Sequence, residues 1–566
     1  MKQSTDLSRR GFLGLGAVAA ASLGITSLVG CSPKVEPQDA PSATGGNAQE
    51  AAAPQTADWL GTAPEIAEDH IAETVNVDVL CVGAGVTGLV AACHVAELGG
   101  KALVVEKMRN PSSFRTDIGA IDSRLQLEKG VHIDKAALAH EIQMYSTGQS
   151  DGRLLKVWMD ESGEAMNWML DFLDENGFRY FLEDDPGSPD MMYREWPVTH
   201  GIQEGTNAME MLVKRVNDHG SEVRFLTKMV KLERKEGGRV TGAICQNLSD
   251  DSYIRVNAAK GVILATGGYA TNNDMLEALN STMLHMCVKK EMTPSQDGDG
   301  IKAALWVGAD MDPDGLLQIF ERGLVPFGPE INQPIDDAQI WWPGSQPFLR
   351  TTLKGERFSN ESTPYDFSLY AIRQRHDNTW VEIFDANWLD HIAAFKTVGC
   401  SRIFDPGTMP GWEPTMPLEA IMGMFQGYQE GGLIVSANTI GELAQKIGAD
   451  PATLQATVSR YNELCEKGVD EDFYKESSRM LALTTPPFYA ARLGGMLLST
   501  GSGLTVDGHM RVLDKQGEVI EGLFATGNDC GGTYARTYPS RVAGMTMGRN
   551  ITFSRHIARF LMGVQA

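Results

Sequence analysis

Residues 77–107 read VDVLCVGAGVTGLVAACHVAELGGKALVVEK. An apolar run typical of a buried strand leads through a glycine turn into an alanine-rich segment typical of a helix, and a second apolar run ends at Glu106. The turn carries G-x-G-x-x-G, in which Gly83 permits the tight turn, Gly85 lets the backbone approach a pyrophosphate, and Gly88 lets the helix pack closely on the sheet. The stretch therefore predicts a βαβ unit that binds a dinucleotide.

The contacts of this unit follow from its order along the chain. The helix begins with unpaired N–H groups and a positive dipole, both of which favour phosphate. Glu106 stands where an acid can accept a hydrogen bond from a ribose 2′-hydroxyl, and its charge would repel a 2′-phosphate. The motif does not choose between NAD and FAD. The residues expected to bind the dinucleotide are Gly83, Ala84, Gly85, Val86, Thr87, Gly88, Glu106 and Lys107.

Length and composition limit the classes of function. A chain of 566 residues exceeds a single hydrophobic core and should divide into two or more domains. The net charge of −24 opposes a role in nucleic-acid binding, because that role needs a basic face. None of the eight cysteines forms a C-x-x-C pair, so the chain has neither a c-type haem attachment motif nor a ferredoxin-type cluster motif. We therefore expect electrons to come from a separate molecule.

The first 30 residues resemble an export signal. The sequence SRRGFL at residues 8–13, followed by an uncharged run to Gly30, matches the twin-arginine pattern. The sequence LVGC at residues 28–31 also resembles a lipobox, which would make Cys31 a lipid-modified first residue; the alternative is a plain cleavage site beside a chance cysteine. Residues 31–58 are rich in Pro, Ala and Gln without apolar periodicity, which predicts a disordered tether.

Three later stretches complete the amino-terminal part. The polar loop after Lys107 lies either on the surface or near the dinucleotide, and in the second case it contributes Arg115, Thr116 and Asp117. Residues 134–176 have apolar residues at helical spacing. The sequence DGDG at residues 297–300 opens another helix; it has too few carboxylates for a calcium loop, so we expect a turn with a helix cap and no metal.

Composition changes in the middle of the chain and then changes back. Residues 312–478 contain more Trp, Pro, Phe and Met, whereas residues 479–566 return to strands and glycine turns. The predicted fold is α/β, with a split Rossmann-like nucleotide domain at residues 59–311 and 479–566. An inserted α+β domain at residues 312–478 would cap the substrate.

Taken in order, the motifs resemble the FAD-dependent fumarate reductase and ketosteroid dehydrogenase superfamily, in its exported reductase branch. The resemblance covers residues 75–561 and rests on GAGVTG with Glu106–Lys107, LATGGYA (264–270), DGDGI (297–301), GERFSNE (355–361), TVSRYNELCEKGVDEDF (457–473), GLFATGN (522–528) and GRNITFSR (548–555). It implies FAD as cofactor. The further FAD contacts that we expect are Ala265, Thr266, Gly267 and Gly268 near the diphosphate and ribose, Asp299, and Asn528 and Asp529 near the ribityl chain.

The resemblance also implies reduction of a carbon–carbon double bond conjugated to a carbonyl or carboxylate. That chemistry needs hydride delivery from flavin N5, a donor that stabilises negative charge on the substrate oxygen, and an acid that protonates the α-carbon. Arg541 falls where fumarate reductases place a carboxylate-binding arginine, so it is the predicted substrate anchor; the alternative is a structural salt bridge.

The sequence departs from fumarate reductases at two places. The histidine before the late glycine turn is replaced by the segment Leu498–Gly501, and the arginine expected soon after Glu361 is absent, so fumarate is not the expected substrate. Tyr538 resembles the tyrosine that holds the substrate ketone in ketosteroid dehydrogenases. The further candidates are Tyr534, and Tyr365 in a proton relay with Glu361; each tyrosine could equally be a packing residue.

Three functions stay open from the sequence. The first is an exported reductase that uses an aromatic or polycyclic unsaturated carbonyl compound as electron acceptor and takes electrons from a cytochrome or a quinol-linked membrane protein. The second is a dehydrogenase that desaturates a ketone such as a steroid. The third is a flavin-bearing electron-transfer or ligand-binding lipoprotein without turnover.

Overall fold

The computed structural model describes residues 58–112, 114–184, 196–203, 207–290, 295–375, 377–395 and 418–564. The predicted signal at residues 1–30 and the tether, except for Asp58, lie outside the described residues. Within the described ranges no helix combines the length and apolar character needed to cross a bilayer.

The predicted βαβ unit lies at the centre of an eight-stranded sheet. Strand β1 (Ile71–Val82) pairs in parallel with β2 (Ala102–Val105) on one side and β9 (Tyr253–Leu264) on the other. The last residues of β1, Val79–Val82, are buried, as expected for a parallel strand covered on both faces. The strand order is β17-β18-β9-β1-β2-β6, with β7 and β8 attached beside β9; the remaining bounds are β6 Glu222–Arg224, β7 Thr227–Arg234, β8 Val240–Asn247, β17 Arg511–Leu513 and β18 Val519–Ala525.

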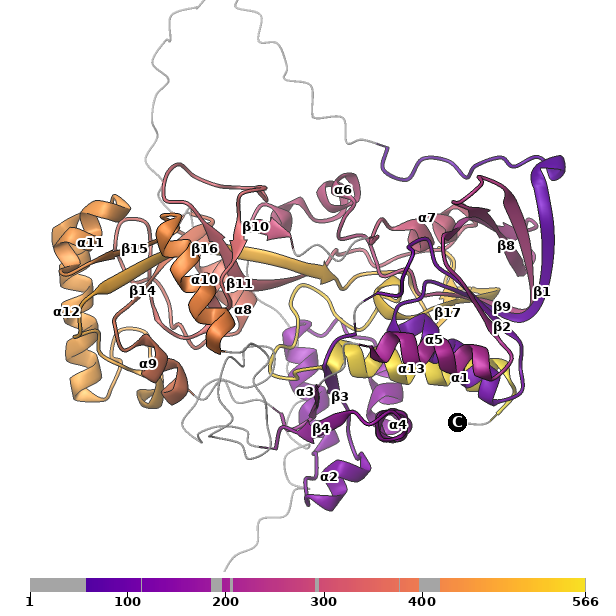
Figure 1. Cartoon of the computed structure of the whole chain (residues 1–566), viewed down its shortest axis with the longest axis horizontal. Helices are drawn as coiled ribbons and strands as arrows, with labels where there is room; N and C mark the ends of the chain where they lie inside the picture. The colour runs from indigo at the N-terminus through magenta and orange to yellow at the C-terminus, as the bar shows by residue number, and fades with distance from the viewer. Residues whose placement is uncertain are drawn as a thin grey trace, which may run out of the picture. The chain divides into compact units, whose positions relative to one another are not determined.

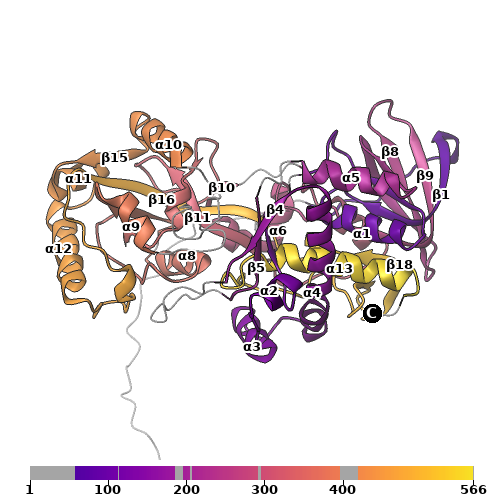
Figure 2. The same cartoon turned by 60° about the horizontal axis from the view of Figure 1, so that its bottom comes forward.

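Segments from both ends of the chain build this first domain. Helix α1 (Val86–Glu97) packs against α5 (Ala208–Asp218) and against the closing helix α13 (Met545–Leu561), which also contacts α4 (Gly152–Glu175). Figures 1 and 2 show the early helix α1 and the yellow α13 side by side. Helix α7 (Asp299–Trp306) packs on β7. The expected α/β fold with a split nucleotide domain is thus observed.

A second, seven-stranded sheet forms the other part of the fold (Figure 1). Its order is β12-β11-β16-β14-β13, with β10 and β15 also paired to the long strand β16 (Phe488–Thr500). The bounds are β10 Cys287–Lys290, β11 Leu317–Val325, β12 Gln339–Ile340, β13 Leu349–Thr351, β14 Thr379–Phe384 and β15 Ile434–Ala437; the accompanying helices are α8 Tyr365–Arg373, α9 Trp388–Phe395, α10 Leu418–Glu430, α11 Ile440–Ile447 and α12 Pro451–Lys467. Strands β10 and β16 lie outside residues 312–478, so the boundaries of the inserted domain stay a prediction.

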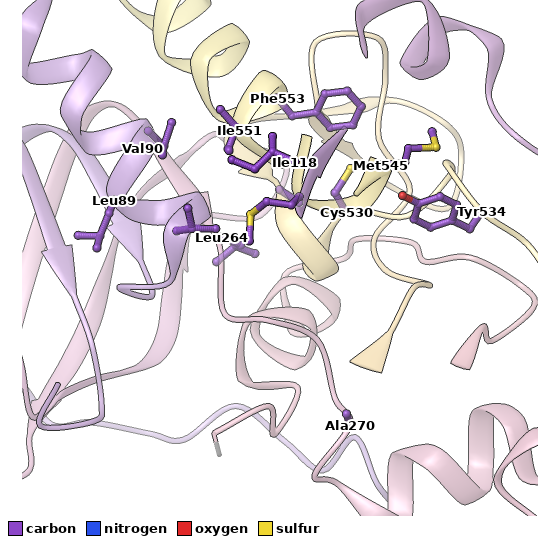
Figure 3. Packing of buried hydrophobic residues seen from close by; sticks show 14 of the residues in the cluster. Leu89, Val90, Ile118, Leu264, Ala270, Cys530, Tyr534, Met545, Ile551 and Phe553 are labelled. Atoms are coloured by element: carbon purple, nitrogen blue, oxygen red, sulfur yellow. The ribbon is translucent and has the colours of Figure 1, made fainter. Parts of the chain in front are cut away.

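A three-stranded sheet, β3 (Asp117–Gly119), β5 (Thr199–Gln203) and β4 (Arg179–Leu182), lies against α13 through β3. Figure 3 shows Ile118 of β3 with Ile551 and Phe553 of α13 in one buried cluster. The stretch predicted to be helical at residues 134–176 consists of two helices, α3 (Lys135–Tyr145) and α4. The remaining elements are α2 Arg124–Glu128, α6 Asn273–Leu284, and the short 3₁₀ turns η1 Glu68–His70, η2 Trp342–Ser345, η4 Ser477–Arg479 and η5 Gly527–Asp529.

Candidate active site

A groove runs from the carboxyl ends of the parallel strands toward the second sheet. Its first part is lined by the turn after β1, by Glu106 and Lys107 after β2, and by the turn after β9. Its second part encloses about 300 Å³ and continues between α13 and the second sheet. The two parts form one groove because they share lining residues, which are Gly85, Ser112, Ala265, Gly267 and Gln296.

The turn after β1 requires residues without side chains at two positions, Gly83 and Gly88. Gly83 has φ +109°, and a Cβ there would lie 2.4 Å from the carbonyl oxygen of Ala265. A Cβ on Gly88 would lie 2.0 Å from the carbonyl oxygen of Gly83. Gly85 caps α1 and borders both parts of the groove, so the backbone at the helix start faces the groove. Ala84, Val86 and Thr87 complete the turn, and Val86 and Thr87 also line the groove.

Glu106 and Lys107 lie at the end of the groove that faces β7. The Glu106 carboxylate accepts hydrogen bonds from the backbone N–H groups of Ala84 and Met108, each at 2.8 Å. The Lys107 ammonium forms ion pairs with Asp297 at 2.6 Å and Asp299 at 2.8 Å. Burial favours a lower pKa for Lys107, but the two carboxylates outweigh it and raise the pKa.

The DGDG stretch holds the loop after β2 in place. The backbone of Gly298, with φ +76°, caps α7, and no side chain caps this helix. Asp297 instead accepts a hydrogen bond from the Thr271 hydroxyl at 2.6 Å, and Asp299 also pairs with Lys228 at 3.2 Å. The expected turn with a helix cap is present, with Gly298 in the cap position, and both carboxylates pair with lysines.

The turn after β9 is tied to the carboxy-terminal part of the chain through Asp529. Its carboxylate accepts the backbone N–H of Gly268 at 3.2 Å and the hydroxyl of Thr266 at 2.8 Å. Burial raises the pKa of the Asp529 carboxyl. Asp529 does not line the groove, whereas its neighbour Asn528 does, together with Ala265, Thr266 and Gly267. Asp529 therefore holds this turn in position. The sequence analysis expected it to contact the cofactor directly.

The far part of the groove has an aromatic and apolar wall with a buried guanidinium. Phe320, Trp342, Tyr365, Leu498 and Met547 supply the wall. The Arg322 guanidinium carbon lies 4.7 Å from the ring centre of Phe320 and 4.2 Å from that of Trp342, and Nε donates to the Ser345 hydroxyl at 2.8 Å. Arg322 is 2 % exposed and lines the groove. A buried guanidinium that contacts two aromatic rings can bind an oxygen with negative charge.

A chain of hydrogen bonds follows the floor of the same part. The Ser499 hydroxyl donates to Gln318 at 2.9 Å, and the Gln318 amide donates to the Thr546 hydroxyl at 3.0 Å. That hydroxyl lies 3.0 Å from the hydroxyl of Tyr534, and the Thr546 backbone N–H donates to the Tyr538 hydroxyl at 3.4 Å. Tyr538 lines the groove and Tyr534 does not. The backbone of Thr546, at the start of α13, therefore contacts the Tyr538 hydroxyl.

The predicted catalytic residues divide into two groups. Tyr365 and Tyr538 line the groove, as do Arg115, Thr116 and Asp117 from the loop whose place the sequence left open. Glu361 does not: it lies in the second domain, paired with Arg357 at 2.8 Å and Lys475 at 3.4 Å. The predicted relay from Glu361 to Tyr365 is therefore replaced by a buried ionic contact.

Arg541 also lies outside the groove lining. Its guanidinium pairs with Glu141 of α3 at 3.0 Å. Sequence spacing suggested Arg541 as a substrate anchor from its position in the chain alone. In the structure its side chain points to Glu141. In this structure Arg322, which the sequence analysis missed, is the buried guanidinium of the apolar end. The local signal was the charged pair Glu321–Arg322 inside β11, whose other residues are uncharged.

Comparison with known proteins decides the family. Residues 78–544 match the model of the FAD binding domain family. The chain belongs to this family. It is an FAD-dependent oxidoreductase. The third hypothesis from the sequence, a flavoprotein without turnover, is therefore excluded.

The relatives of this family member include reductases and dehydrogenases. A vinyl phenol reductase of Lactiplantibacillus plantarum is 26% identical over 496 residues, covering 86% of this chain and 97% of the relative. A probable fumarate reductase of Shewanella frigidimarina is 25% identical over 486 residues, covering 85% and 74%. The fold is similar to that of a 3-ketosteroid Δ1-dehydrogenase from Sterolibacterium denitrificans (TM-score 0.64, 18% identity, 86% and 99% covered). A flavocytochrome c3 fumarate reductase gives a TM-score of 0.62 at 23% identity, with 87% and 79% covered.

The residues along the groove fit FAD. Asn528 Oδ1 and Gln296 Oε1 are buried, and neither has a hydrogen-bond partner among the residues that the structure describes. Both side chains line the groove, where a cofactor with polar groups would remove the free-energy cost of two unpaired buried amide oxygens. An acidic residue at one end, a glycine turn opening a helix, and amides farther along are the groups that an extended dinucleotide requires.

Proposed function

We propose that the protein is an exported FAD-dependent reductase of a carbon–carbon double bond conjugated to a carbonyl or carboxylate, other than fumarate, and that this compound serves as a respiratory electron acceptor. The observation that carries the proposal is the aromatic end of the groove, where Arg322 contacts the rings of Phe320 and Trp342. The reductases named among the relatives act, by their names, on vinyl phenol, acrylate and fumarate, which supports double-bond reduction as the reaction class.

The wall of the groove favours an aromatic or polycyclic substrate. Phe320, Trp342 and Tyr365 offer ring faces, and Leu498 and Ser499 add no charge at the position where the sequence lacks the histidine of fumarate reductases. Apolar surface binds apolar surface, and a small dicarboxylate would leave these rings without contact. We therefore expect one carbonyl or carboxylate group on a larger apolar body.

Different residues of the groove have different roles in the proposed reaction. Bound FAD supplies the hydride. The Arg322 guanidinium stabilises negative charge on the substrate oxygen, and its burial against the Phe320 and Trp342 rings excludes water, which strengthens its electrostatic effect. The Tyr538 hydroxyl, oriented by the Thr546 backbone, is a second hydrogen-bond donor to the same oxygen.

A dehydrogenase acting on a steroid-like ketone is the second candidate. The place of Tyr538 along the groove favours it, because a phenol that holds a ketone serves desaturation as well as reduction. Steady-state rates with reduced methyl viologen and an unsaturated acid or enone, set against rates with an oxidising dye and the saturated compound, separate the two directions. Faster turnover in the oxidative direction for every pair would contradict the reductase.

The location and the electron donor belong to the same proposal. The twin-arginine pattern at residues 8–13 supports export, and Cys31 supports a lipid anchor on the cell membrane. Because the chain has no C-x-x-C-H motif for covalent haem, a separate cytochrome or a quinol-linked membrane protein would supply the electrons.

A further inference from the structure

A buried carboxylic acid lies along the substrate end of the groove, and the reaction described above has not used it. Asp366 stands in the first turn of α8, is 5 % exposed, and lines the groove beside Tyr365. Its carboxyl accepts a hydrogen bond from the backbone N–H of Tyr538, so it lies next to the loop before α13 that carries Tyr538.

The surroundings of Asp366 favour its protonated form. Burial is the main cause and the negative charge of Glu321 adds to it, while backbone N–H groups act in the opposite direction; together they raise the pKa of Asp366 to about 7. Glu321, on β11, is paired with Arg350 at 2.7 Å. The other titratable groups whose charge acts on Asp366, or on which it acts, are Tyr145 of α3 and Tyr370 of α8.

We propose that Asp366 is the acid that protonates the substrate α-carbon; this inference rests on the proposed reductase function. As hydride from reduced FAD forms the C–H bond at the β-carbon, the π electron pair moves toward the α-carbon and its carbonyl oxygen. The O–H bond of Asp366 then breaks and a C–H bond forms at the α-carbon, which leaves a saturated product, oxidised FAD and the Asp366 carboxylate. A proton from water restores the acid before the next turnover.

Two of the acids that the sequence suggested, Glu361 and Tyr534, are less suited to this step. Glu361 is held by Arg357 and Lys475 outside the lining. Burial raises the pKa of Tyr534, which makes its phenol a weaker acid, and Tyr534 does not line the groove. A carboxylic acid that is protonated near neutral pH can release its proton to a carbanion-like carbon and recover it from solvent.

The test compares Asp366→Asn with a matched control, Asp377→Asn. Asparagine keeps an oxygen that accepts the Tyr538 N–H and loses only the acidic proton. Asp377 is a second aspartate whose pKa burial raises, and it does not line the groove. Each purified holoenzyme is photoreduced without oxygen, and flavin reoxidation is followed after mixing with an excess of the unsaturated compound that reoxidises the wild type fastest.

We expect Asp366→Asn to slow reoxidation by roughly 10²–10⁴-fold, the usual contribution of a general acid, and Asp377→Asn to leave it unchanged. Reoxidation by a one-electron dye and FAD content should be the same in all three proteins. The wild-type rate should fall as pH rises through about 7, because the protonated acid is lost, and this fall should be absent in Asp366→Asn. Asp366→Glu should recover part of the rate with a pH-dependent profile, which a merely structural aspartate would not produce.

The outcomes separate the two claims. A wild type that no unsaturated compound reoxidises overturns the proposed function and this inference with it. A wild type that turns over, with Asp366→Asn reacting as fast as Asp377→Asn or with an unchanged pH profile, overturns the role of Asp366 alone.

Discussion

Arg322 and Arg541 show that a side chain's partners, rather than its position in the chain, decide what it can contact. Both are arginines near the groove, yet Arg322 lies over the rings of Phe320 and Trp342 in the lining, whereas Arg541 pairs with Glu141 of α3. Sequence spacing pointed to Arg541 and gave no weight to Arg322. The stacking of Arg322 results from strand β11 meeting the short turn η2, which is not visible locally in the sequence.

Replacing Arg322 should damage the reaction more than replacing Arg541. Arg322→Lys removes the planar fork and the stacking, so substrate-dependent flavin reoxidation should fall by roughly 10²–10³-fold, as for the loss of one oxyanion donor. Arg541→Lys, which can still pair with Glu141, should lose less. Stopped-flow reoxidation measures both variants. A larger loss in Arg541→Lys would mean that Arg541 leaves Glu141 to bind the substrate.

At the level of elements, the turn between β1 and α1 sets the distance between a helix and two strands. Gly88 lies against the carbonyl of Gly83, and Gly83 lies against the carbonyl of Ala265. Both glycines were predictable because the G-x-G-x-x-G pattern is local. The break between α3 and α4 was missed although it has local signals, since Gly148 has φ +78° and the Asp151 side chain caps α4 by accepting the Arg153 N–H at 2.8 Å.

Gly88→Ala should destabilise the protein and weaken FAD binding. The added Cβ would meet the Gly83 carbonyl at 2.0 Å and force α1 away from the turn, at a cost of about 1–3 kcal/mol. Gly441→Ala in α11 is the matched control, because its Cβ meets nothing within 4 Å and should stabilise the helix slightly. Thermal unfolding and flavin content measure both effects. Equal melting temperatures would show that the turn tolerates a side chain.

For the whole molecule, the split nucleotide domain was predictable and the composition of the second sheet was not. Glycine motifs at both ends of the chain indicate a divided domain, and α13 does pack on α1. Strand β16 follows the predicted boundary at residue 478 but pairs with β11 and β14, because its pairing partners come from distant sequence. Asp366 could not be predicted as a candidate, because its contact with the backbone of Tyr538 joins two segments that are distant in sequence.

Export can be tested on the full chain. If the proposed export is correct, replacing Arg9 and Arg10 together with Lys should keep the mature-size protein from appearing outside the cytoplasm, because the twin-arginine pair is the proposed signal. Cys31→Ser should leave export intact and move the protein from the membrane pellet to the soluble fraction. Cell fractionation with immunoblotting measures both, and normal export of the lysine variant would contradict the signal.

The central claim is that this FAD enzyme reduces a conjugated double bond on an apolar body. The most direct measurement photoreduces the flavin of the purified wild type without oxygen and follows its absorbance as unsaturated aromatic acids, enones and fumarate are added one at a time. We predict rapid reoxidation by at least one apolar acid or enone and little by fumarate. If no unsaturated compound reoxidises the flavin, and saturated ketones instead reduce the oxidised flavin, the claim is contradicted and the protein is a dehydrogenase.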